Sequence, residues 1–223
     1  MNTGKSIRQS VERNPDAKSA LEAIDAASRG ECWLVGGSIR DAILGASELR
    51  DLDIVIREND QEVFQSLDRL GSTYEFNRRG MRRYRVGGLL IDLIEPSKFY
   101  RGLSTIESIL CFFDLKINAL GLHLGSNTVL DHLNGNECIQ RHQVGINWHR
   151  WNSSQMTRDE QWLLLLRLVR IIERHPDLRV ESPSVEPLRR FVAQLDGSTW
   201  AWAATRFPPG EELLIRKVKS LIS

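Results

Sequence analysis

Two glycines near the start of the chain have the type and setting of a phosphate-binding turn. Gly36 and Gly37 follow a short apolar run and precede Ser38 and a predicted helix. Because glycine has no side chain, a ligand can approach the backbone there. The free N–H groups at the start of a helix suit a phosphate. Arg40, one turn into that helix, can add a fixed positive fork.

Two aspartates follow at the spacing of a metal site. Asp51 and Asp53 flank one leucine at the start of a second apolar run. Residues two apart on a strand point to one face, so both carboxylates project together. Mg²⁺ needs such hard oxygen ligands when it also binds substrate phosphates. The alternative is a glycine turn and unrelated surface acids. We favour the site because both halves occur in order, a preference that rests largely on the resemblance given below.

The elements expected around these residues form an α+β domain. Amphipathic spacing predicts helices over residues 6–28 (divided near its start by Pro15), 38–44 and 61–70. Apolar and alternating runs predict strands over residues 32–35, 52–56, 82–86 and 89–94, with strand-rich sequence at 115–124 and 128–131. Gly87-Gly88 joins two of these strands as a two-residue hairpin turn.

The character of the chain changes near residue 157. Residues 159–174 predict a strong helix, and the remainder is helical with interruptions at Pro183, Pro187, Pro208 and Pro209. We therefore predict two domains. Residues 1–145 form an α+β domain with a mixed, mostly antiparallel sheet flanked by helices, and residues 146–223 form a small helical domain.

Composition sets further bounds on function. With a net charge of +1, no overall field attracts nucleic acid, so a polyanion site depends on local arginines. The cysteines are far apart and suggest neither zinc nor a disulfide framework; they are Cys32, Cys111 and Cys138. The N-terminus lacks a secretory apolar region, and no apolar run can span a bilayer. We expect a cytoplasmic protein without a membrane partner.

One segment resembles the head domain of the class II tRNA nucleotidyltransferase and bacterial poly(A) polymerase family. It reads Leu34-Val-Gly-Gly-Ser-Ile-Arg-Asp-Ala-Ile-Leu-Gly45, followed by Asp51-Leu-Asp53. That family belongs to the DNA polymerase β-like nucleotidyltransferase superfamily, and its first motif reads approximately LVGGxVRDxLLG, then DxD. The resemblance implies that Gly37 and Arg40 contact a triphosphate and that the two aspartates bind Mg²⁺. Gly36 and Ser38 belong to the same nucleotide-binding turn.

Two later segments resemble further parts of the site. Leu90-Ile-Asp-Leu-Ile94 is similar to the strand whose acid, here Asp92, completes the metal carboxylates. The alternative is an acid on the solvent face of an edge strand. Phe113-Asp-Leu-Lys-Ile-Asn-Ala119 is similar to the family's RRDFTINA motif and retains Asp114 and Asn118, which the resemblance places in the nucleotide site.

Two more matches complete the family's order. Val129-Leu-Asp-His-Leu-Asn-Gly135 resembles its DPxGG turn, which shapes the domain. Asp159–Ile171 resembles its EDPxRxLRxxRF helix, with Gln161 at the base-reading aspartate. Arg167 and Arg170 stand three apart and share a helix face, where they would clamp phosphates or the RNA backbone. The alternative is a solvated basic stripe.

The chain also departs from the family. Phe112 and Phe113 replace the RRD arginines, and Leu164 replaces the first arginine of the helix. Leucine cannot donate to a base, so we expect relaxed nucleotide choice rather than strict CTP-then-ATP addition. The chain ends about fifty residues after Arg170. We therefore expect the body and tail that grip tRNA to be absent or much reduced.

Two groups of residues have no place in these motifs. An arginine cluster consists of Arg78, Arg79, Arg82, Arg83 and Arg85. Arg83 and Arg85 share a strand face next to the proposed metal strand, where they bind phosphate or protect an edge strand with charge. The second group consists of the tryptophans Trp148, Trp151, Trp200 and Trp202. Tryptophans can stack on bases, but in a helical segment they are more typical of a core or an interface.

Together these features predict a Mg²⁺-dependent nucleotidyltransferase. It would transfer a nucleoside monophosphate from an NTP, ATP or CTP, to an acceptor hydroxyl, foremost an RNA 3′ end. One alternative is a toxin-like enzyme that modifies a protein or small molecule. Another is a degenerate nucleotide-binding regulatory module, against which the intact DLD and GGSIRD sequences argue. The sequence leaves the acceptor, the preferred nucleotide and the oligomeric state open.

Overall fold

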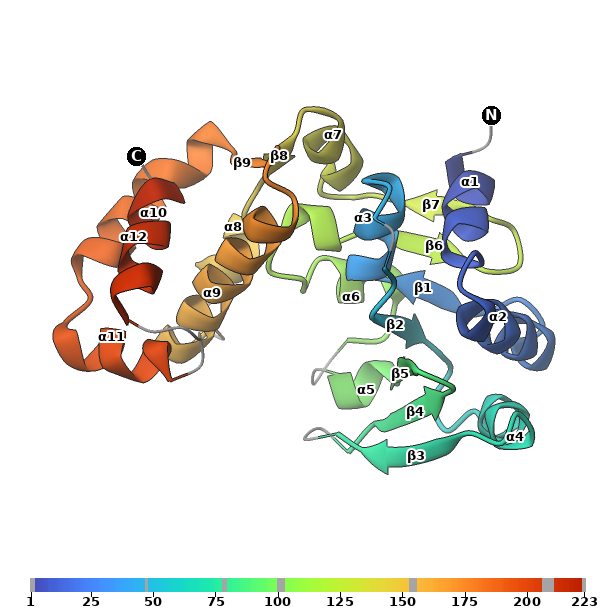
Figure 1. Cartoon of the computed structure of the whole chain (residues 1–223). Helices are drawn as coiled ribbons and strands as arrows, with labels where there is room; N and C mark the ends of the chain where they lie inside the picture. Colours follow the sequence, from blue (N-terminus) through green and yellow to red (C-terminus); the bar gives the residue numbers. More distant parts are fainter. Residues whose placement is uncertain are drawn as a thin grey trace. The chain divides into compact units, whose positions relative to one another are not determined.

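The computed structural model describes residues 3–46, 48–77, 80–99, 103–152, 156–205 and 211–221. They form two compact units (Figure 1). Unit 1 contains the described residues up to Phe113 and Ile117–Asn136, and unit 2 contains Asp114–Lys116 and the described residues from Glu137 onward. The functional domains expected at 1–145 and 146–223 stay a prediction. Arg78, Arg79, Pro208 and Pro209 lie outside the described residues.

Unit 1 is built on a seven-stranded sheet with the order β3-β4-β5-β2-β1-β6-β7 in the described chain. The strands are β1 (Trp33–Val35), β2 (Asp51–Val55), β3 (Thr73–Phe76), β4 (Arg82–Val86), β5 (Leu89–Ile94), β6 (Gly121–His123) and β7 (Val129–Leu130). Only β2 and β5 pair in parallel among these neighbours; the other pairs are antiparallel. The predicted fold class, a mixed and mostly antiparallel sheet flanked by helices, is confirmed.

Helices follow the strands of unit 1 in the expected places. They are α1 (Thr3–Val11), α2 (Pro15–Ser28), α3 (Gly37–Ile43), α4 (Gln61–Arg69), α5 (Pro96–Phe99) and α6 (Ile106–Leu110). Pro15 divides α1 from α2 because it occupies the first turn of α2, where its missing N–H costs nothing. The Asn14 side chain caps this helix by accepting a hydrogen bond from the Ala17 N–H at 3.0 Å.

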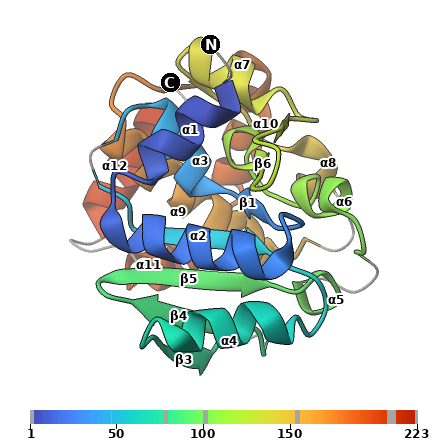
Figure 2. The ribbon, with the colours of Figure 1, turned by 90° about the vertical axis from the view of Figure 1, so that its right-hand side faces the viewer.

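Helices α2 and α4 lie side by side on one face of the sheet (Figure 2). The sheet residues on this face include Leu52 and Ile91, which neighbour each other in register and are fully buried. The helices contribute Leu21, Ile24 and Leu67, which are also fully buried. Removing this apolar surface from water is the main force that holds the helices on the sheet.

The opposite face of the sheet carries Asp51 and Asp53, and a second apolar cluster covers part of it. Val35, Val55 and Ile94 are buried there together with Ile109 and Leu110 of α6. Partly buried side chains pack against this cluster from α5, α6 and the segment after α6; among them are Phe99, Ile106 and Phe113. The cluster fixes the strands that carry the carboxylates.

Unit 2 is mostly helical. Its helices are α8 (Trp148–Trp151), α9 (Arg158–Arg174), α10 (Ser182–Ala193), α11 (Gly197–Ala204) and α12 (Glu211–Leu221). A two-stranded parallel sheet pairs β8 (Gln143–Val144) with β9 (Arg179–Val180). Thr157 and Glu160 form a capping box at the start of α9. Helix α7 (Gly135–Gln140) spans the boundary between the units in the sequence.

Aromatic side chains form much of the core of unit 2. Trp162 is 1% exposed, and its ring lies 4.9 Å from that of Trp200 and 6.1 Å from that of Phe191, both with edge-to-face geometry. Trp151 is also buried and contacts Phe191. Trp151 and Trp200 are therefore core residues, as the sequence favoured. No helix among the described residues has the length and apolarity needed to cross a membrane.

Two secondary-structure expectations are wrong. Pro187 does not interrupt a helix, because α10 (Ser182–Ala193) continues through it. Residues 115–124 do not form continuous strand, because Lys116–Asn118 form a 3₁₀ turn and strand β6 begins only at Gly121. The short helices α5, α6 and α7 were not expected either. Each has six residues or fewer in this structure, too short for the helical period to be recognised in the sequence.

The packing of unit 2 yields a stability prediction. We expect Trp162→Ala to lower the free energy of unfolding by about 3–5 kcal/mol, because it empties a fully buried aromatic site. Leu163→Ala is the matched control, since Leu163 is the next residue of α9 and is 45% exposed; we expect a change within about 0.5 kcal/mol. Urea denaturation measures both, and equal losses for the two variants would contradict this packing.

Candidate phosphate and metal site

The turn that enters α3 requires glycine at position 36. Gly36 has φ +83° and ψ −145°, a backbone conformation open essentially to glycine alone. A Cβ atom there would lie 3.0 Å from Oδ2 of Asp53 and 3.4 Å from Cε1 of Phe113. The Gly36 N–H donates to the carbonyl of Leu120 at 3.2 Å. The turn therefore lies directly against the Asp53 carboxyl group.

The guanidinium of Arg40 lies next to this turn, close to Gly37. It donates to Oδ1 of Asp41 at 2.7 Å and to Oδ1 of Asn118 at 2.6 Å, and the residue is 5% exposed. A Cβ on Gly37 would lie 3.2 Å from Nη2 of Arg40. The absence of a side chain at Gly37 therefore leaves room for the Arg40 guanidinium. Contact between Arg40 and a phosphate stays a prediction; in this structure the hydrogen bond from Arg40 to Asn118 joins α3 to another segment of unit 1.

Ser38 lies in the first turn of α3. The residue is 4% exposed, and its Oγ has no hydrogen-bond partner among the described residues. A buried polar atom left without a partner costs free energy. An acceptor that reached this hydroxyl would therefore gain a hydrogen bond at no desolvation cost to the serine. This geometry fits the expected role of Ser38, which stays a prediction.

The three aspartates named from the sequence lie on one face of two adjacent strands. Asp53 on β2 is directly opposite Asp92 on β5, and Asp51 precedes Asp53 by two residues. Partial desolvation raises the pKa of the Asp51 carboxyl, and the negative charges of Asp92 and Asp41 raise it further, against the opposing charges of Arg40 and Arg50. Carboxylates that repel one another in this way favour a nearby cation.

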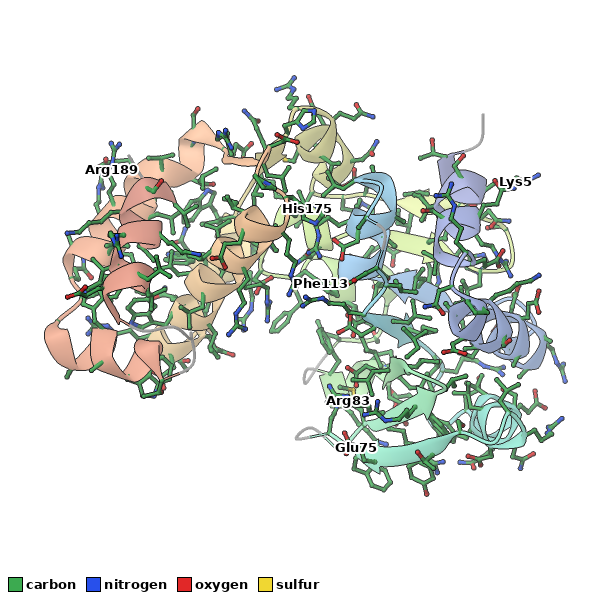
Figure 3. The ribbon with its side chains drawn as sticks, viewed as in Figure 1. Lys5, Glu75, Arg83, Phe113, His175 and Arg189 are labelled. Carbon is green, nitrogen blue, oxygen red and sulfur yellow. The ribbon has the colours of Figure 1, made fainter. Side chains whose placement is uncertain are left out.

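Asp92 lies on an interior strand, since β5 runs between β4 and β2. The alternative interpretation, an acid on an edge strand, is therefore wrong. Arg83 of β4 stands opposite Asp92 and binds both of its oxygens, with Nε–Oδ1 2.8 Å and Nη2–Oδ2 2.9 Å. The hydrogen bond to Asp92 raises the pKa of Arg83. The side chains of Arg83 and Glu75 are marked in Figure 3.

The donor set fits a magnesium ion only in part. Among the described residues, no group of three or more His, Cys, Asp or Glu side chains is arranged to hold a metal. However, Mg²⁺ is commonly held by one or two carboxylates together with substrate phosphates. Asp51 and Asp53 supply such a pair on one strand, beside the glycine turn. Metal binding by Asp51, Asp53 and Asp92 stays a prediction.

The other predicted nucleotide-binding residues belong to unit 2. Arg167 of α9 pairs with Oδ2 of Asp114, whose Oδ1 is buried with no hydrogen-bond partner in the described chain. Arg170 is exposed on the same helix face as Arg167. The Gln161 side chain donates to the carbonyl of Trp151 at 3.4 Å. Contacts of these residues with a nucleotide stay predictions.

The alignment of Leu164 with a base-reading arginine suggested that Leu164 lines an open pocket for the base. The structure contradicts this suggestion. The residue is 1% exposed and belongs to the buried stripe of α9. Helix α9 is apolar over much of its circumference, so its sequence does not reveal which leucines face inward. An arginine at position 164 would place a charge in an apolar interior and destabilise the protein.

Sequence reasoning missed two charged neighbours of the site, Asp41 and Glu75, and missed that Arg83 binds Asp92. Asp41 pairs with Arg40, Arg83 binds Asp92, and Glu75 lies 3.8 Å from Arg83. A signal for the second contact was present, because a two-residue turn at Gly87-Gly88 fixes the hairpin register and places residue 83 opposite residue 92. The arginine cluster was noticed, but its carboxylate partner was not.

The chain is similar to several solved structures. A CCA-adding enzyme in complex with CTP is 19% identical, with a TM-score of 0.73, over 99% of this chain and 55% of that one. A Thermotoga maritima CCA-adding enzyme complexed with tRNA is 20% identical, with a TM-score of 0.68, over 99% and 54%. A tRNA-processing enzyme in an apo form is 19% identical, with a TM-score of 0.59, over 93% and 52%.

The likeness concerns the fold. The chain spans about half the length of these solved structures. No protein-family model matches the chain, and no curated protein matches it in sequence. The chain therefore has the fold of the corresponding part of CCA-adding enzymes, which agrees with the family that its motifs resemble.

The backbone at Gly36 yields a second stability prediction. We expect Gly36→Ala to destabilise the protein by about 1–3 kcal/mol, because alanine strains this backbone conformation and crowds the Asp53 carboxyl group. Gly45→Ala is the control, since Gly45 also has a positive φ but a Cβ atom there would meet no atom of the described residues within 4 Å. Urea denaturation compares the two. A loss for Gly36→Ala no larger than for Gly45→Ala would show that the contact with Asp53 is loose.

Arg40 yields a third prediction. We expect Arg40→Ala to lower the free energy of unfolding by about 3 kcal/mol, because it removes one partner of a buried ion pair. Arg13→Ala is the control, because Arg13 is exposed, and we expect a change within about 0.5 kcal/mol. If Arg40→Ala is as stable as the control, the guanidinium has a different role from the support described above.

Proposed function

We propose that the chain is a Mg²⁺-dependent nucleotidyltransferase that transfers a nucleoside monophosphate from ATP or CTP to the 3′ hydroxyl of an RNA. The observation that carries this proposal is the contact between the glycine turn at Gly36 and strand β2, which carries Asp51 and Asp53. The turn at Gly36 lies against Asp53, and Asp51 projects from the same face of β2 as Asp53. The fold shared with CCA-adding enzymes supports it.

Each residue of the site has a separate task. Asp51 and Asp53 would hold Mg²⁺, and the backbone at Gly36 and Gly37 would receive the triphosphate, with the Ser38 hydroxyl as an added donor. Arg40 keeps the turn in place through Asp41 and Asn118. When bound, Mg²⁺ lowers the pKa of a coordinated hydroxyl and offsets charge on the phosphates.

The reaction makes few covalent demands on the protein. The acceptor oxygen attacks the α-phosphorus, and a new P–O bond forms as the bond from the α-phosphorus to the bridging oxygen breaks. Pyrophosphate leaves, and the hydroxyl proton passes to solvent. Phosphoryl and nucleotidyl transfer of this kind depend chiefly on positioning and charge compensation. A turn and two carboxylates fixed on a sheet meet that demand.

A second candidate is a nucleotide-binding module that does not transfer. The observation that favours it is the pairing of Asp92 with Arg83, which engages both oxygens of the third carboxylate. If the acceptor is a protein or a small molecule in place of RNA, the transfer reaction would use the same site.

One experiment separates these functions. The purified protein is incubated with total RNA, a cell extract freed of RNA, and each labelled NTP in turn, with Mg²⁺ or with EDTA. We expect Mg²⁺-dependent label on RNA 3′ ends. Label on protein or a small molecule in the extract would replace RNA as the acceptor. Binding of NTP without transfer to any acceptor would favour the module.

Asp53 yields the prediction for catalysis. We expect Asp53→Asn to reduce transfer by at least about a thousandfold, since it removes a metal-binding charge with little change of shape. Asp177→Asn is the control, because Asp177 is exposed in unit 2, and we expect unchanged transfer. Labelled product per unit time is measured, with far-ultraviolet circular dichroism to verify folding. Near-native turnover of a folded Asp53→Asn protein would exclude the metal site.

A further inference from the structure

Arg83 and Asp92 form a contact that the transfer reaction does not need. The planar guanidinium of Arg83 binds Oδ1 and Oδ2 of Asp92 with two parallel hydrogen bonds, at 2.8 and 2.9 Å. Such bidentate pairs are among the stronger charge-assisted interactions. The register of β4 and β5 places the two residues opposite each other, so the backbone itself sets the contact. One cation therefore already engages both oxygens of Asp92.

The surroundings explain why a cation is held there. Asp92 stands opposite Asp53, and Asp51 projects from the same face. Carboxylates gathered in this way repel one another unless positive charge lies among them. Arg83 supplies that charge from the neighbouring strand, with side-chain exposed fractions of 35% for Arg83 and 16% for Asp92.

Arg83 also has a second carboxylate within reach. Glu75 of β3 stands opposite Arg83, and its Oε1 lies 3.8 Å from Nη1 of Arg83 (Figure 3). Glu75 is the more exposed partner, with 70% of its side chain accessible. Arg83 thus lies between two acids on adjacent strands. The same guanidinium therefore has both carboxylates close to it.

We propose that Arg83 is a built-in counter-ion that withholds Asp92 from a divalent cation until Arg83 moves to Glu75. The proposal rests on the proposed function, because it takes Asp51 and Asp53 as the residues that bind the cation first. Arg83 is a positioning residue: it stabilises the carboxylates without metal and determines when Asp92 joins them. An anionic substrate that draws Arg83 away would thereby complete the metal site.

The test measures binding of Mn²⁺, without nucleotide, from the electron paramagnetic resonance signal of the free ion. We expect Arg83→Gln to lower the Kd for Mn²⁺ at least about tenfold, the equivalent of about 1.4 kcal/mol. Arg85→Gln is the matched control, because Arg85 is an exposed arginine on the same strand and the same face. It removes the same charge and should change the Kd by no more than about twofold, because screening weakens the effect of an exposed charge.

A double variant shows whether the gain depends on Asp92. In Arg83→Gln with Asp92→Asn, we expect the increase in affinity to disappear. The proposal is overturned if Arg83→Gln binds Mn²⁺ no more tightly than Arg85→Gln, or if the gain persists in the double variant. Binding by the unaltered protein that equals Arg83→Gln refutes this inference alone. Absence of Mn²⁺ binding in every protein also overturns this inference, whereas the transfer assay with labelled NTP judges the proposed function separately.

A second measurement covers the case in which Arg83→Gln is unstable. We expect its melting temperature to fall without metal and to recover with added Mn²⁺, by more than that of the unaltered protein. Arg83→Lys keeps the positive charge but not the planar guanidinium. Its Kd for Mn²⁺ should therefore lie between the values for the unaltered protein and for Arg83→Gln. A loss of stability that Mn²⁺ does not restore would give Arg83 a purely structural role and contradict the proposal.

Discussion

The close approach of the Gly36 backbone to the Asp53 carboxyl group is the constraint on which the site depends. A Cβ atom at position 36 would lie 3.0 Å from Oδ2 of Asp53, so any side chain there would crowd the carboxylate. The same approach brings the start of α3 and strand β2 together. A phosphate at the turn would lie beside a cation held by Asp51 and Asp53. Neither the turn nor the carboxylates alone would specify such a site.

The balance of charge determines how the site is held before any ligand arrives. Arg40 lies next to the glycine turn and donates hydrogen bonds to Asp41 and Asn118. Arg83 donates hydrogen bonds to Asp92. Both arginines donate hydrogen bonds to side chains of unit 1. The sheet can therefore carry three aspartates on one face while retaining a folded structure without metal. Preorganised charge of this kind suits a reaction that depends on electrostatic stabilisation.

Local features of the sequence were sufficient for much of this arrangement. The glycine pair, the spacing of Asp51 and Asp53, and the hairpin at Gly87-Gly88 each depend on neighbouring residues, so they could be recognised without the fold. The position of Asp92 on an interior strand agrees with the prediction that it joins the other two acids.

Features that depend on distant residues could not be predicted in the same way. The burial of Arg40 depends on Asn118, 78 residues away, and the loss of strand at 116–118 accompanies that contact. The burial of Leu164 depends on how a largely apolar helix is oriented. Nothing in the spacing of residues along α9 distinguishes an inward leucine from one that lines an open pocket.

The fate of the phosphates tests the central claim most directly. In a single turnover with RNA and Mg²⁺, ATP or CTP labelled at the α-phosphate is compared with the same nucleotide labelled at the γ-phosphate. We expect the α label in RNA and the γ label in pyrophosphate. Label from the γ position in the RNA, or both labels retained in intact nucleotide, would contradict the assignment of this site as a nucleotidyltransferase.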